Sequence, residues 1–489
     1  MATIEELTRA ALRREPDRPA LEFNGAWINW GELSRIAATV RSAIQTNSGK
    51  VALVTRNRPS GLAALLGLLA DGHAIRMVYP FQSAAALAAD LERIGPASVV
   101  ADREDLAPEV LQALDNLDAT IVALDGAEAS LLRSGVVTDS ARFHAAPGIE
   151  ILTSGTTGPP KPFALSYQQV IDHILGESVY PAKQVGDPAE LPPTLLMFPV
   201  GNISGLYSTL PPLITGQRAV LLEKFTVAGW HDYVVRFRPV MSGMPPAGLQ
   251  MVLDADIPPQ DLSSLQVMGT GAAPLDPSVK RAFEDRYGLP VLLSYGATEF
   301  AGPVTRMTPE LLQQWGEEKF TSVGRALPGV QLRVLDPDTK EELPAGQEGL
   351  LEVVSPRIGP HWIRTSDLAA IDADGFLYHR GRADGAIMRG GFKLMPGIIE
   401  QALQTHPAVA QACVVGIADH RLGEVPVAAI EIAAGQTAPA TKALEDHLRG
   451  QLPSTHVPSD WRLLPALPRT PSMKVDLPAV RRLFEKPAE

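Results

Sequence analysis

A run of hydroxyl, glycine, proline and lysine residues, TSGTTGPPKP, follows a short apolar stretch that is typical of a strand. Consecutive backbone N–H groups in a glycine-rich turn form a concave donor surface, and glycine lets that backbone approach an anion closely. The hydroxyl groups add donors, and the lysine adds a positive charge. This chemistry suits a polyphosphate. The residues that we assign to phosphate binding are Thr153, Ser154, Gly155, Thr156, Thr157, Gly158 and Lys161.

Three later stretches also concentrate polar groups at turns: SYGATEF, RTSDLAAIDADGFLYHRGRADG and PRTPSMKVD. In the first, Thr298 is placed to contact a phosphate and Glu299 to bind a metal ion. In the second, the Asp367 carboxylate can accept both hydroxyl groups of a ribose, and Arg382 follows it. The third sets Lys474 in a turn near the end of the chain. Each residue alone is more often a cap, a turn residue or a solvated charge, but their joint order favours one shared site.

Two common nucleotide-binding motifs are excluded. A Walker loop needs Gly-Lys followed by Ser or Thr, whereas Lys161 lies between two prolines. The stretch VMGTGAAPL begins like a dinucleotide-binding fingerprint, but Pro274 stands where its last glycine belongs. The sequence therefore argues against a P-loop NTPase and against a Rossmann dehydrogenase.

Composition restricts the class of protein and its partners. A chain of 489 residues is expected to form two or more domains. Its formal charge of −12 argues against binding to nucleic acid or to an anionic membrane. The single cysteine, Cys413, excludes intrachain disulfides and fits a reducing compartment. The first residues do not read as a secretory signal, and the longest apolar run is too short to span a bilayer, so we expect a cytoplasmic protein.

Alternating elements predict an α/β fold for the first part of the chain. Helix-like stretches, such as 60–69 and 84–94, alternate with the apolar strands KVALV and ASVVA. This order predicts a parallel sheet that is covered by helices. The alternation continues through LQVMGTG, after which Asp276 and Pro277 predict the start of a helix and Gly288 its end.

The pattern of expected strands, turns and helices changes twice in the last third of the sequence. From about residue 321, short β-like segments alternate with Asp-Gly and Pro-Gly turns. After Arg382, a helix, two strands and a second helix are expected in GIIEQALQTH, AQACVVGI, VPVAAIEI and TKALEDHLRGQL. We therefore expect a large N-terminal domain at residues 1–382 and a small α+β C-terminal domain at residues 383–489.

The four polar motifs, in this order, resemble those of the adenylate-forming superfamily of acyl-CoA synthetases, nonribosomal adenylation domains and luciferases. TSGTTGPPK resembles its phosphate loop, YGATE and TSDLAAIDADGFLYHRGRADGAI resemble the next two motifs, and LPRTPSMKVD resembles its C-terminal lysine motif. The stretch PDRPALEFNGAWINWGEL near the N-terminus also resembles this family, so the resemblance covers nearly the whole chain. At VYPFQSAA the chain departs from the family, which has a turn richer in proline and asparagine there.

The resemblance implies a fold and a reaction. The N-terminal domain would consist of stacked α/β sheets with a distorted β-barrel, and the C-terminal domain would be mobile. The implied cofactors are ATP, Mg²⁺ and coenzyme A. A carboxylate would attack the α-phosphate of ATP and expel pyrophosphate, and the acyl group would then pass to a thiol. Such a transfer depends mainly on positioning and on neutralisation of charge.

The resemblance also implies a role for each motif residue. The phosphate loop would hold the β- and γ-phosphates, Thr298 would contact the α-phosphate and Glu299 would bind Mg²⁺. Lys474 would bridge the substrate carboxylate and the α-phosphate, stabilising charge in the transition state. Asp367 would hold the ribose, with Arg382 near it. The implied adenine-binding residues are Gly271, Ala272, Ala273, Pro274, Ser294, Tyr295 and Gly296.

The second half-reaction implies a movement of the small domain. Rotation about the hinge residue Asp384 would remove Lys474 from the site and bring in the loop RGGFKLMP. In that loop, Gly390 and Gly391 would line the tunnel for the pantetheine arm of CoA. The implied acyl-pocket residues are Asn202, Ile203, Ser204, Met244, Met268, Gly269 and Ala297.

The segment MFPVGNISGLYSTLPPLITG restricts the acid that this pocket would accept. Many relatives have a histidine or aromatic gate at the position of Asn202, and asparagine can neither stack nor protonate there. Relatives that activate amino acids usually hold the α-ammonium with an aspartate in this segment, which here contains no acidic residue. Walls rich in methionine and glycine suit an apolar acyl or aryl group. We therefore expect a carboxylic acid without an amino group, transferred to CoA.

Two alternatives stay open. The acyl adenylate could load the phosphopantetheine of a separate carrier protein, because the sequence ends shortly after the lysine motif. The chain could also be a nucleotide-binding protein without catalytic activity, although all the charged and hydroxyl residues of the later motifs are present. The sequence leaves the oligomeric state open, with a homodimer as one arrangement.

Overall fold

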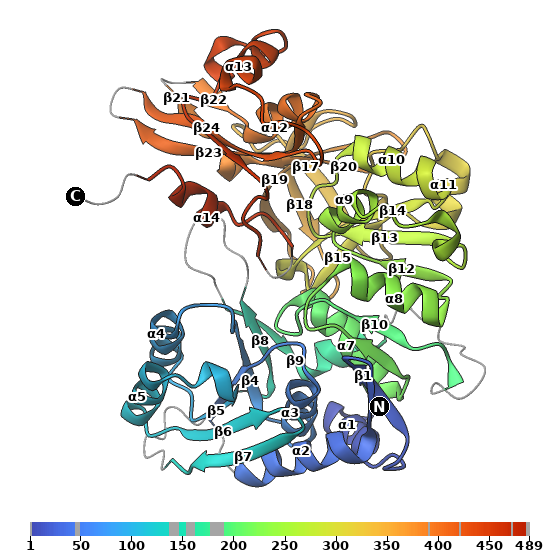
Figure 1. The fold of residues 1–489 in the computed structure, drawn as a ribbon, viewed down its shortest axis with the longest axis vertical. Coiled ribbons are helices and arrows are strands. Elements are labelled where there is room, and N and C mark those ends of the chain that lie inside the picture. The colour runs from blue at the N-terminus through green and yellow to red at the C-terminus, as the bar shows by residue number, and fades with distance from the viewer. Residues whose placement is uncertain are drawn as a thin grey trace. The chain divides into compact units, whose positions relative to one another are not determined.

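The computed structural model describes residues 2–44, 49–135, 146–152, 162–176, 190–389, 392–419, 422–470 and 473–485. They form two compact units (Figure 1). Unit 1 comprises the described residues up to 239 together with 297–302, and unit 2 comprises the others. Among the helices of these residues, none is both long enough and apolar enough to cross a membrane.

A seven-stranded sheet with the order β7-β6-β5-β3-β4-β8-β9 forms the centre of unit 1. Its inner strands are parallel, whereas β7 and β9 run antiparallel at the two edges. The predicted strands KVALV and ASVVA are confirmed as β3 and β5. The strands are β3 (Lys50–Val54), β4 (Ala74–Val78), β5 (Ser98–Asp102), β6 (Thr120–Asp125), β7 (Glu128–Arg133), β8 (Gly148–Leu152) and β9 (Pro162–Ser166).

Helices cover both faces of this sheet, as the alternation of elements predicted. Helices α4 (Ala84–Ile94) and α5 (Pro108–Asn116) pack against one set of alternating strand residues. Helices α2 (Trp30–Ala43) and α3 (Pro59–Ala70) pack against the other set. All 12 residues of α3 are buried, which explains why its sequence is apolar on every side.

A second, four-stranded sheet of unit 1 has the order β10-β11-β1-β2. Its strands are β1 (Pro19–Phe23), β2 (Ala26–Asn29), β10 (Thr194–Leu196) and β11 (Ala219–Leu221). The other helices of the unit are α1 (Ile4–Leu12), α6 (Tyr167–Gln169) with its continuation to Leu175, α7 (Ile203–Thr215) and α8 (Val227–Phe237). Helix α7 connects β10 to β11, so the start of the predicted acyl-pocket segment is fixed at the end of a strand.

Unit 2 begins with a sheet in the order β12-β13-β14-β15-β16, in which β12, β13 and β14 are parallel. The strands are β12 (Met241–Gly243), β13 (Val267–Gly271), β14 (Val291–Ala297), β15 (Gly302–Arg306) and β16 (Arg325–Ala326). The helices are α9 (Pro246–Asp254), α10 (Pro277–Tyr287) and α11 (Pro309–Trp315). The predicted bounds of α10 are confirmed, because Asp276 caps its first turn and Gly288 ends it with a φ of 63°.

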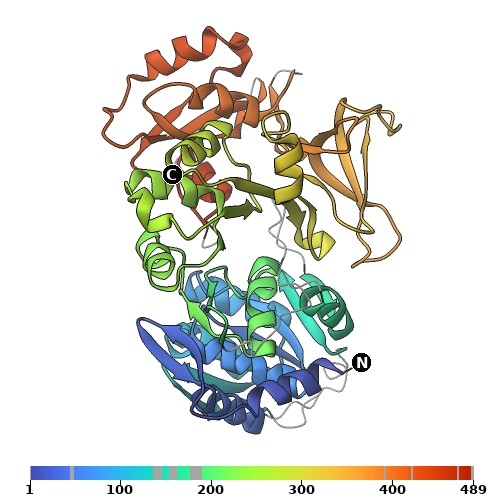
Figure 2. The same ribbon diagram turned by 90° about the vertical axis from the view of Figure 1, so that its right-hand side faces the viewer.

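The β-like segments predicted after residue 321 form an antiparallel sheet in the order β17-β18-β19-β20 (Figure 2, orange). The strands are β17 (Gln331–Leu335), β18 (Glu348–Val354), β19 (Ile363–Ile371) and β20 (Leu377–Arg382). Where a distorted barrel was expected, the strand pairs of the described residues form this open sheet and do not close β17 onto β20.

The last part of unit 2 has the small α+β pattern that the sequence predicted. Its sheet has the order β22-β21-β24-β23, and β25 pairs with β24. The strands are β21 (Ile387–Arg389), β22 (Phe392–Leu394), β23 (Val409–Asp419), β24 (Gly423–Ile432) and β25 (Trp461–Leu464). The helices are α12 (Pro396–Gln404), α13 (Thr441–Arg449) and α14 (Leu477–Arg482). Cys413 of β23 is buried, as expected for a structural thiol.

A carboxyl group on α12 makes the stability of this last part depend on pH. The backbone N–H of Val414 donates a hydrogen bond of 2.7 Å to Oε1 of Glu400. Burial raises the pKa of Glu400 to about 7, and this hydrogen bond only partly opposes the effect. The folded state therefore binds a proton more tightly than the unfolded state, and stability falls as the pH rises from about 4.5 to about 7.

We expect the substitution Glu400→Gln to remove this loss. Glutamine keeps a carbonyl oxygen for Val414 and does not ionise, so the free energy of unfolding should rise by about 1–3 kcal/mol near pH 8 and change little near pH 5. Thermal unfolding of the whole chain at both pH values measures this difference. Glu445→Gln on α13 is the matched control. An equal effect of Glu400→Gln at both pH values would contradict the assignment.

Candidate functional site

Residues predicted to bind a ribose and an adenine meet in unit 2 around one carboxylate. Asp367 of β19 is buried and lies in register with Arg382 of β20. The hydroxyl group of Tyr295 on β14 donates a hydrogen bond to Oδ2 of Asp367. The Nε2 atom of His379 lies 3.5 Å from Oδ1 of Asp367, and the Nη1 atom of Arg382 lies 3.6 Å from the same oxygen. Three of these four residues were predicted from the sequence, and His379 was not.

The surroundings of Asp367 keep its carboxylate ionised. Burial favours the neutral form, but hydrogen bonds from His379 and Tyr295, together with the charges of His379 and Arg382, outweigh it and lower the pKa of Asp367. The rings of Tyr295 and His379 stack with centroids 5.6 Å apart. An ionised carboxylate has about four lone-pair sites, so it can accept sugar hydroxyl groups beside the tyrosine hydroxyl.

The predicted adenine-binding residues lie at the carboxyl ends of two adjacent parallel strands. Gly271 of β13 is in register with Ser294 of β14, next to Tyr295. A Cβ atom on Gly271 would lie 2.4 Å from the Ser294 hydroxyl oxygen, so this close approach needs glycine. The chain then turns at Ala272, whose φ is 66°. Ligands of open α/β sheets usually bind at this edge, so the position suits a base that is joined to the ribose.

Thr298 and Glu299 lie in unit 1, on the single turn that follows β14. Phe300 is buried and anchors this turn, whereas Glu299 is exposed and Thr298 is partly exposed. The turn ends at Ala301, which has a φ of 56° and whose N–H donates a hydrogen bond of 2.9 Å to the carbonyl oxygen of Thr298. The two predicted residues are therefore presented by a turn with a defined conformation.

The exposed carboxylate of Glu299 fits Mg²⁺ only as part of a complex with phosphates. Within the described residues, no group of three or more His, Cys, Asp or Glu side chains could hold a metal ion. Magnesium in nucleotide enzymes is commonly bound by one or two carboxylates together with substrate phosphates. A single acidic side chain on a fixed turn meets that requirement, and a metal site built from protein ligands alone does not fit here.

The predicted phosphate loop lies outside the described residues, but its two flanking strands are described. Strands β8 and β9 are antiparallel neighbours, and Leu152 is in register with Pro162. Ile149 and Ile151 of β8 are fully buried. The predicted strand before the run is confirmed as β8, and β9 follows the run. The seven residues from Thr153 to Lys161 that we assigned to phosphate binding all lie in the part that is not described.

Lys474 lies on a turn that is tied to the sheet of the C-terminal part. The N–H of Thr470 donates a hydrogen bond of 2.7 Å to the carbonyl oxygen of Lys474. The Arg469 side chain donates to Oε1 of Gln411 at 2.6 Å and to Oε2 of Glu431 at 3.2 Å, which fixes the turn on β23 and β24. Lys474 is partly exposed, and α14 begins directly after this turn.

The predicted hinge and CoA-tunnel residues are only partly described. Asp384 lies in a single 3₁₀ turn, Ala383–Gly385, between β20 and β21. Gly390 and Gly391 lie outside the described residues. The hinge residue therefore stands at the junction between two sheets, while its role in a rotation remains a prediction.

The predicted acyl-pocket residues lie on separate elements. Asn202 caps α7, and its Oδ1 accepts a hydrogen bond of 2.7 Å from the N–H of Gly205. Ile203 is buried and Ser204 is partly exposed, and both lie in the first turn of α7. The side chain of Asn202 is therefore engaged in capping, which supports the view that it does not serve as a gate.

The remaining predicted pocket residues lie on β13 and β14 and directly after β12. Met244 and Met268 are fully buried. Along β13 the exposure alternates, so Gly269 lies on the partly exposed face and Met268 on the opposite one. Gly269 is in register with Gly243, and Ala297 ends β14. Gly269 thus leaves room above the sheet, whereas Met268 belongs to the core beneath it.

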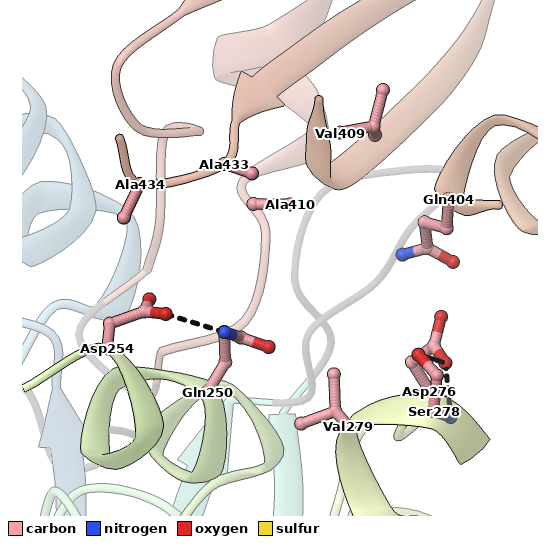
Figure 3. A pocket seen from close by; sticks show the side chains of 10 residues that line it. All are labelled: Gln250, Asp254, Asp276, Ser278, Val279, Gln404, Val409, Ala410, Ala433 and Ala434. Atoms are coloured by element: carbon pink, nitrogen blue, oxygen red, sulfur yellow. Dashed lines mark hydrogen bonds between the residues drawn. The ribbon is translucent and has the colours of Figure 1, made fainter. Parts of the chain in front are cut away.

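A cavity in unit 2 is lined by none of these residues (Figure 3). Its volume is about 160 Å³, which is smaller than the usual 300–1,000 Å³ of a small-molecule site. Four of its polar side chains are already used in local hydrogen bonds, because Gln250 donates to Asp254 and Ser278 donates to Asp276. We therefore do not assign it to substrate. The lining residues are Gln250, Asp254, Asp276, Ser278, Val279, Gln404, Val409, Ala410, Ala433 and Ala434.

Comparisons with known families match nearly the whole chain. Residues 7–360 match the AMP-binding enzyme family, and residues 398–474 match the AMP-binding enzyme C-terminal domain. Indoleacetate–CoA ligase of Aromatoleum aromaticum is 29% identical over 96% of each chain. A fatty acid–[acyl-carrier-protein] ligase, ScoC of Streptomyces coeruleorubidus, is 26% identical over 97% of this chain and 95% of its own.

A solved structure supports the fold. The ATP-bound crystal structure of MatB from Rhodopseudomonas palustris has a TM-score of 0.78 and 22% identity, and the match covers 99% of both chains. At this identity the likeness concerns the fold alone. It agrees with the mixed α/β architecture and the separate C-terminal part described above.

Proposed function

This chain belongs to the AMP-binding enzyme family, in the acyl-CoA synthetase branch of the adenylate-forming superfamily, and on this premise we propose that it joins an apolar acyl or aryl carboxylic acid to coenzyme A. The observation that carries the proposal is the ionised, buried Asp367 with Tyr295, His379 and Arg382 around it. This cluster offers a ribose an acceptor at the edge of a sheet whose glycines leave room for a flat base.

The first half-reaction forms an acyl adenylate. An oxygen of the substrate carboxylate attacks the α-phosphorus of ATP, the bond to the β-phosphate oxygen breaks, and pyrophosphate leaves. Thr298 donates a hydrogen bond to the α-phosphate, and Lys474 offsets the negative charge that builds between the carboxylate and that phosphate. Glu299 would hold Mg²⁺, which would neutralise charge on the phosphates when it is bound.

The second half-reaction transfers the acyl group. The thiolate sulfur of CoA attacks the carbonyl carbon, the bond between that carbon and the phosphate oxygen breaks, and AMP leaves. The thiol proton is released to solvent. A rotation at Asp384 would withdraw Lys474 and bring up the loop that contains Gly390 and Gly391, because one site cannot hold both the lysine and an incoming thiol.

The substrate class follows from side chains that are missing from the pocket segment. Residues 197–216 contain no acidic side chain that could pair with an α-ammonium group, which supports an acid without an amine. Gly243 and Gly269 lie side by side and leave room for an acyl chain or a ring. We propose a cytoplasmic reaction, in keeping with the single buried thiol.

The proposal is tested by pyrophosphate release from Mg-ATP with aliphatic, aryl and polycyclic acids, each with and without CoA. Repeated turnover that needs CoA, for one class of acid, is the expected result. It would also name the substrate class. No release with any acid would contradict the proposal and favour a nucleotide-binding protein without catalytic activity.

A carrier-protein acceptor is the second candidate, and the similarity to a fatty acid–[acyl-carrier-protein] ligase over 97% of the chain favours it. In that case, release should stop after one turnover with or without CoA. Addition of a phosphopantetheinylated carrier protein should then restore repeated turnover.

A further inference from the structure

A tyrosine of α7 is bonded to the turn that presents Thr298 and Glu299. The hydroxyl group of Tyr207 donates a hydrogen bond of 2.8 Å to the carbonyl oxygen of Ala301. Its ring lies against Gly302, where an added Cβ atom would come within 2.7 Å of the ring carbon Cε2. All of these residues belong to unit 1. The tyrosine therefore contacts the turn with both its ring and its hydroxyl group.

The turn needs such a contact, because its end has an unfavourable backbone conformation. Ala301 has a φ of 56°, in the left-handed region where a Cβ atom is crowded. Non-glycine residues remain in this region only where the surrounding structure holds them there. Gly302 follows with a φ of 127°, which side-chain-bearing residues rarely adopt. The Tyr207 hydroxyl bonds the residue at which the chain reverses, directly after Glu299 and Phe300.

Tyr207 also belongs to the helix that would form part of the acyl pocket. It follows Ile203 by four residues, so the two side chains lie on the same face of α7, one turn apart. We propose that Tyr207 is a positioning residue for adenylation. It holds Thr298 and Glu299 in the geometry that the α-phosphate and Mg²⁺ require, and it links their position to the helix that contacts the acid. This inference rests on the proposed function.

The test compares two hydroxyl deletions in the same unit. Tyr207→Phe keeps the ring against Gly302 and removes the hydroxyl group that donates to Ala301. Tyr233→Phe on α8 is the matched control, because the Tyr233 hydroxyl donates a similar bond of 3.1 Å to the carbonyl oxygen of Pro193. Thermal unfolding should show small and similar losses for both variants, which would establish that both fold.

Kinetics then separates positioning from a purely structural role. For Tyr207→Phe we expect kcat for acyl adenylate formation to fall roughly ten- to hundredfold, with the KM for ATP little changed. A higher Mg²⁺ concentration should be needed for half-maximal rate. Tyr233→Phe should keep the wild-type kcat. Equal kcat values in the two variants and the wild type would overturn the inference while leaving the proposed function intact.

A second measurement does not require turnover. Hydrogen exchange at the amide of Ala301, which is bonded to Thr298, should be faster in Tyr207→Phe than in Tyr233→Phe. The gain in ATP affinity on addition of Mg²⁺ should also shrink in Tyr207→Phe alone. If the wild type releases no pyrophosphate with any acid, the proposed function fails. Unchanged exchange and unchanged Mg²⁺-dependent affinity would then also overturn the positioning role.

Discussion

Lys474→Ala is expected to lower the rate of acyl adenylate formation by roughly 10²–10³-fold, while ATP still binds with nearly wild-type affinity. The lysine acts on charge that develops between the carboxylate and the α-phosphate, so its loss affects the transition state more than the ground state. The turn that presents it is held by Arg469, which does not depend on the lysine side chain. The measurements are single-turnover formation of acyl-AMP and, separately, ATP affinity by calorimetry.

The two half-reactions provide an internal control for this variant. Transfer from a preformed acyl adenylate to CoA should proceed at close to the wild-type rate, because the lysine serves only the first step. Lys442→Ala on α13 is a matched charge deletion at an exposed position, and it should leave both half-reactions unchanged. Undiminished acyl-AMP formation by Lys474→Ala would contradict the role of the lysine and leave the family assignment untouched.

Local signals in the sequence were sufficient to predict many elements of the fold. Both ends of helix α10 were predicted correctly because each depends on one nearby residue. Asp276 caps the first turn, and Gly288 ends the helix in a left-handed conformation. Helix α3 was found because it is apolar over a length that suits a helix and not a strand. The barrel was inferred from resemblance alone, and the strands placed there form a sheet whose described pairings leave it open.

The contacts that define the candidate site could not be predicted in the same way. Tyr295 and Asp367 are 72 residues apart, and Tyr207 and Ala301 are 94 residues apart, so no local pattern connects them. His379 was missed although an Asp-Gly turn between β-like segments was predicted just before it. A register shift between Leu368 and Ala369 changes which residues of β19 and β20 face each other. Motif order identified the site residues one by one, whereas their mutual contacts depend on strand pairing over long distances.

Asp367→Asn is expected to raise the KM for ATP roughly ten- to hundredfold, with a smaller effect on kcat. Hydrogen bonds to a charged acceptor contribute about 1.5–3 kcal/mol each, and asparagine retains one acceptor oxygen without the charge. The side chain of asparagine also places an N–H donor where one carboxylate oxygen was an acceptor. This donor would lie beside His379 and Arg382, which are themselves donors to that carboxylate. Because the pKa of Asp367 is lowered, the wild-type carboxylate stays ionised, and its contribution to ATP binding should be constant from about pH 5 to 9.

A ribose analogue distinguishes direct contact from a general disturbance of the site. Wild-type protein should bind 3′-deoxy-ATP more weakly than ATP, because one hydroxyl group that Asp367 accepts is missing. Asp367→Asn should bind the two nucleotides with nearly equal affinity, since the discriminating acceptor has already been lost. Tyr295→Phe, which removes the neighbouring donor and keeps the carboxylate, should retain the wild-type ratio. If Asp367→Asn kept the full wild-type ratio, Asp367 would not contact the ribose, and the ionised cluster would serve only to join β14 to β19 and β20.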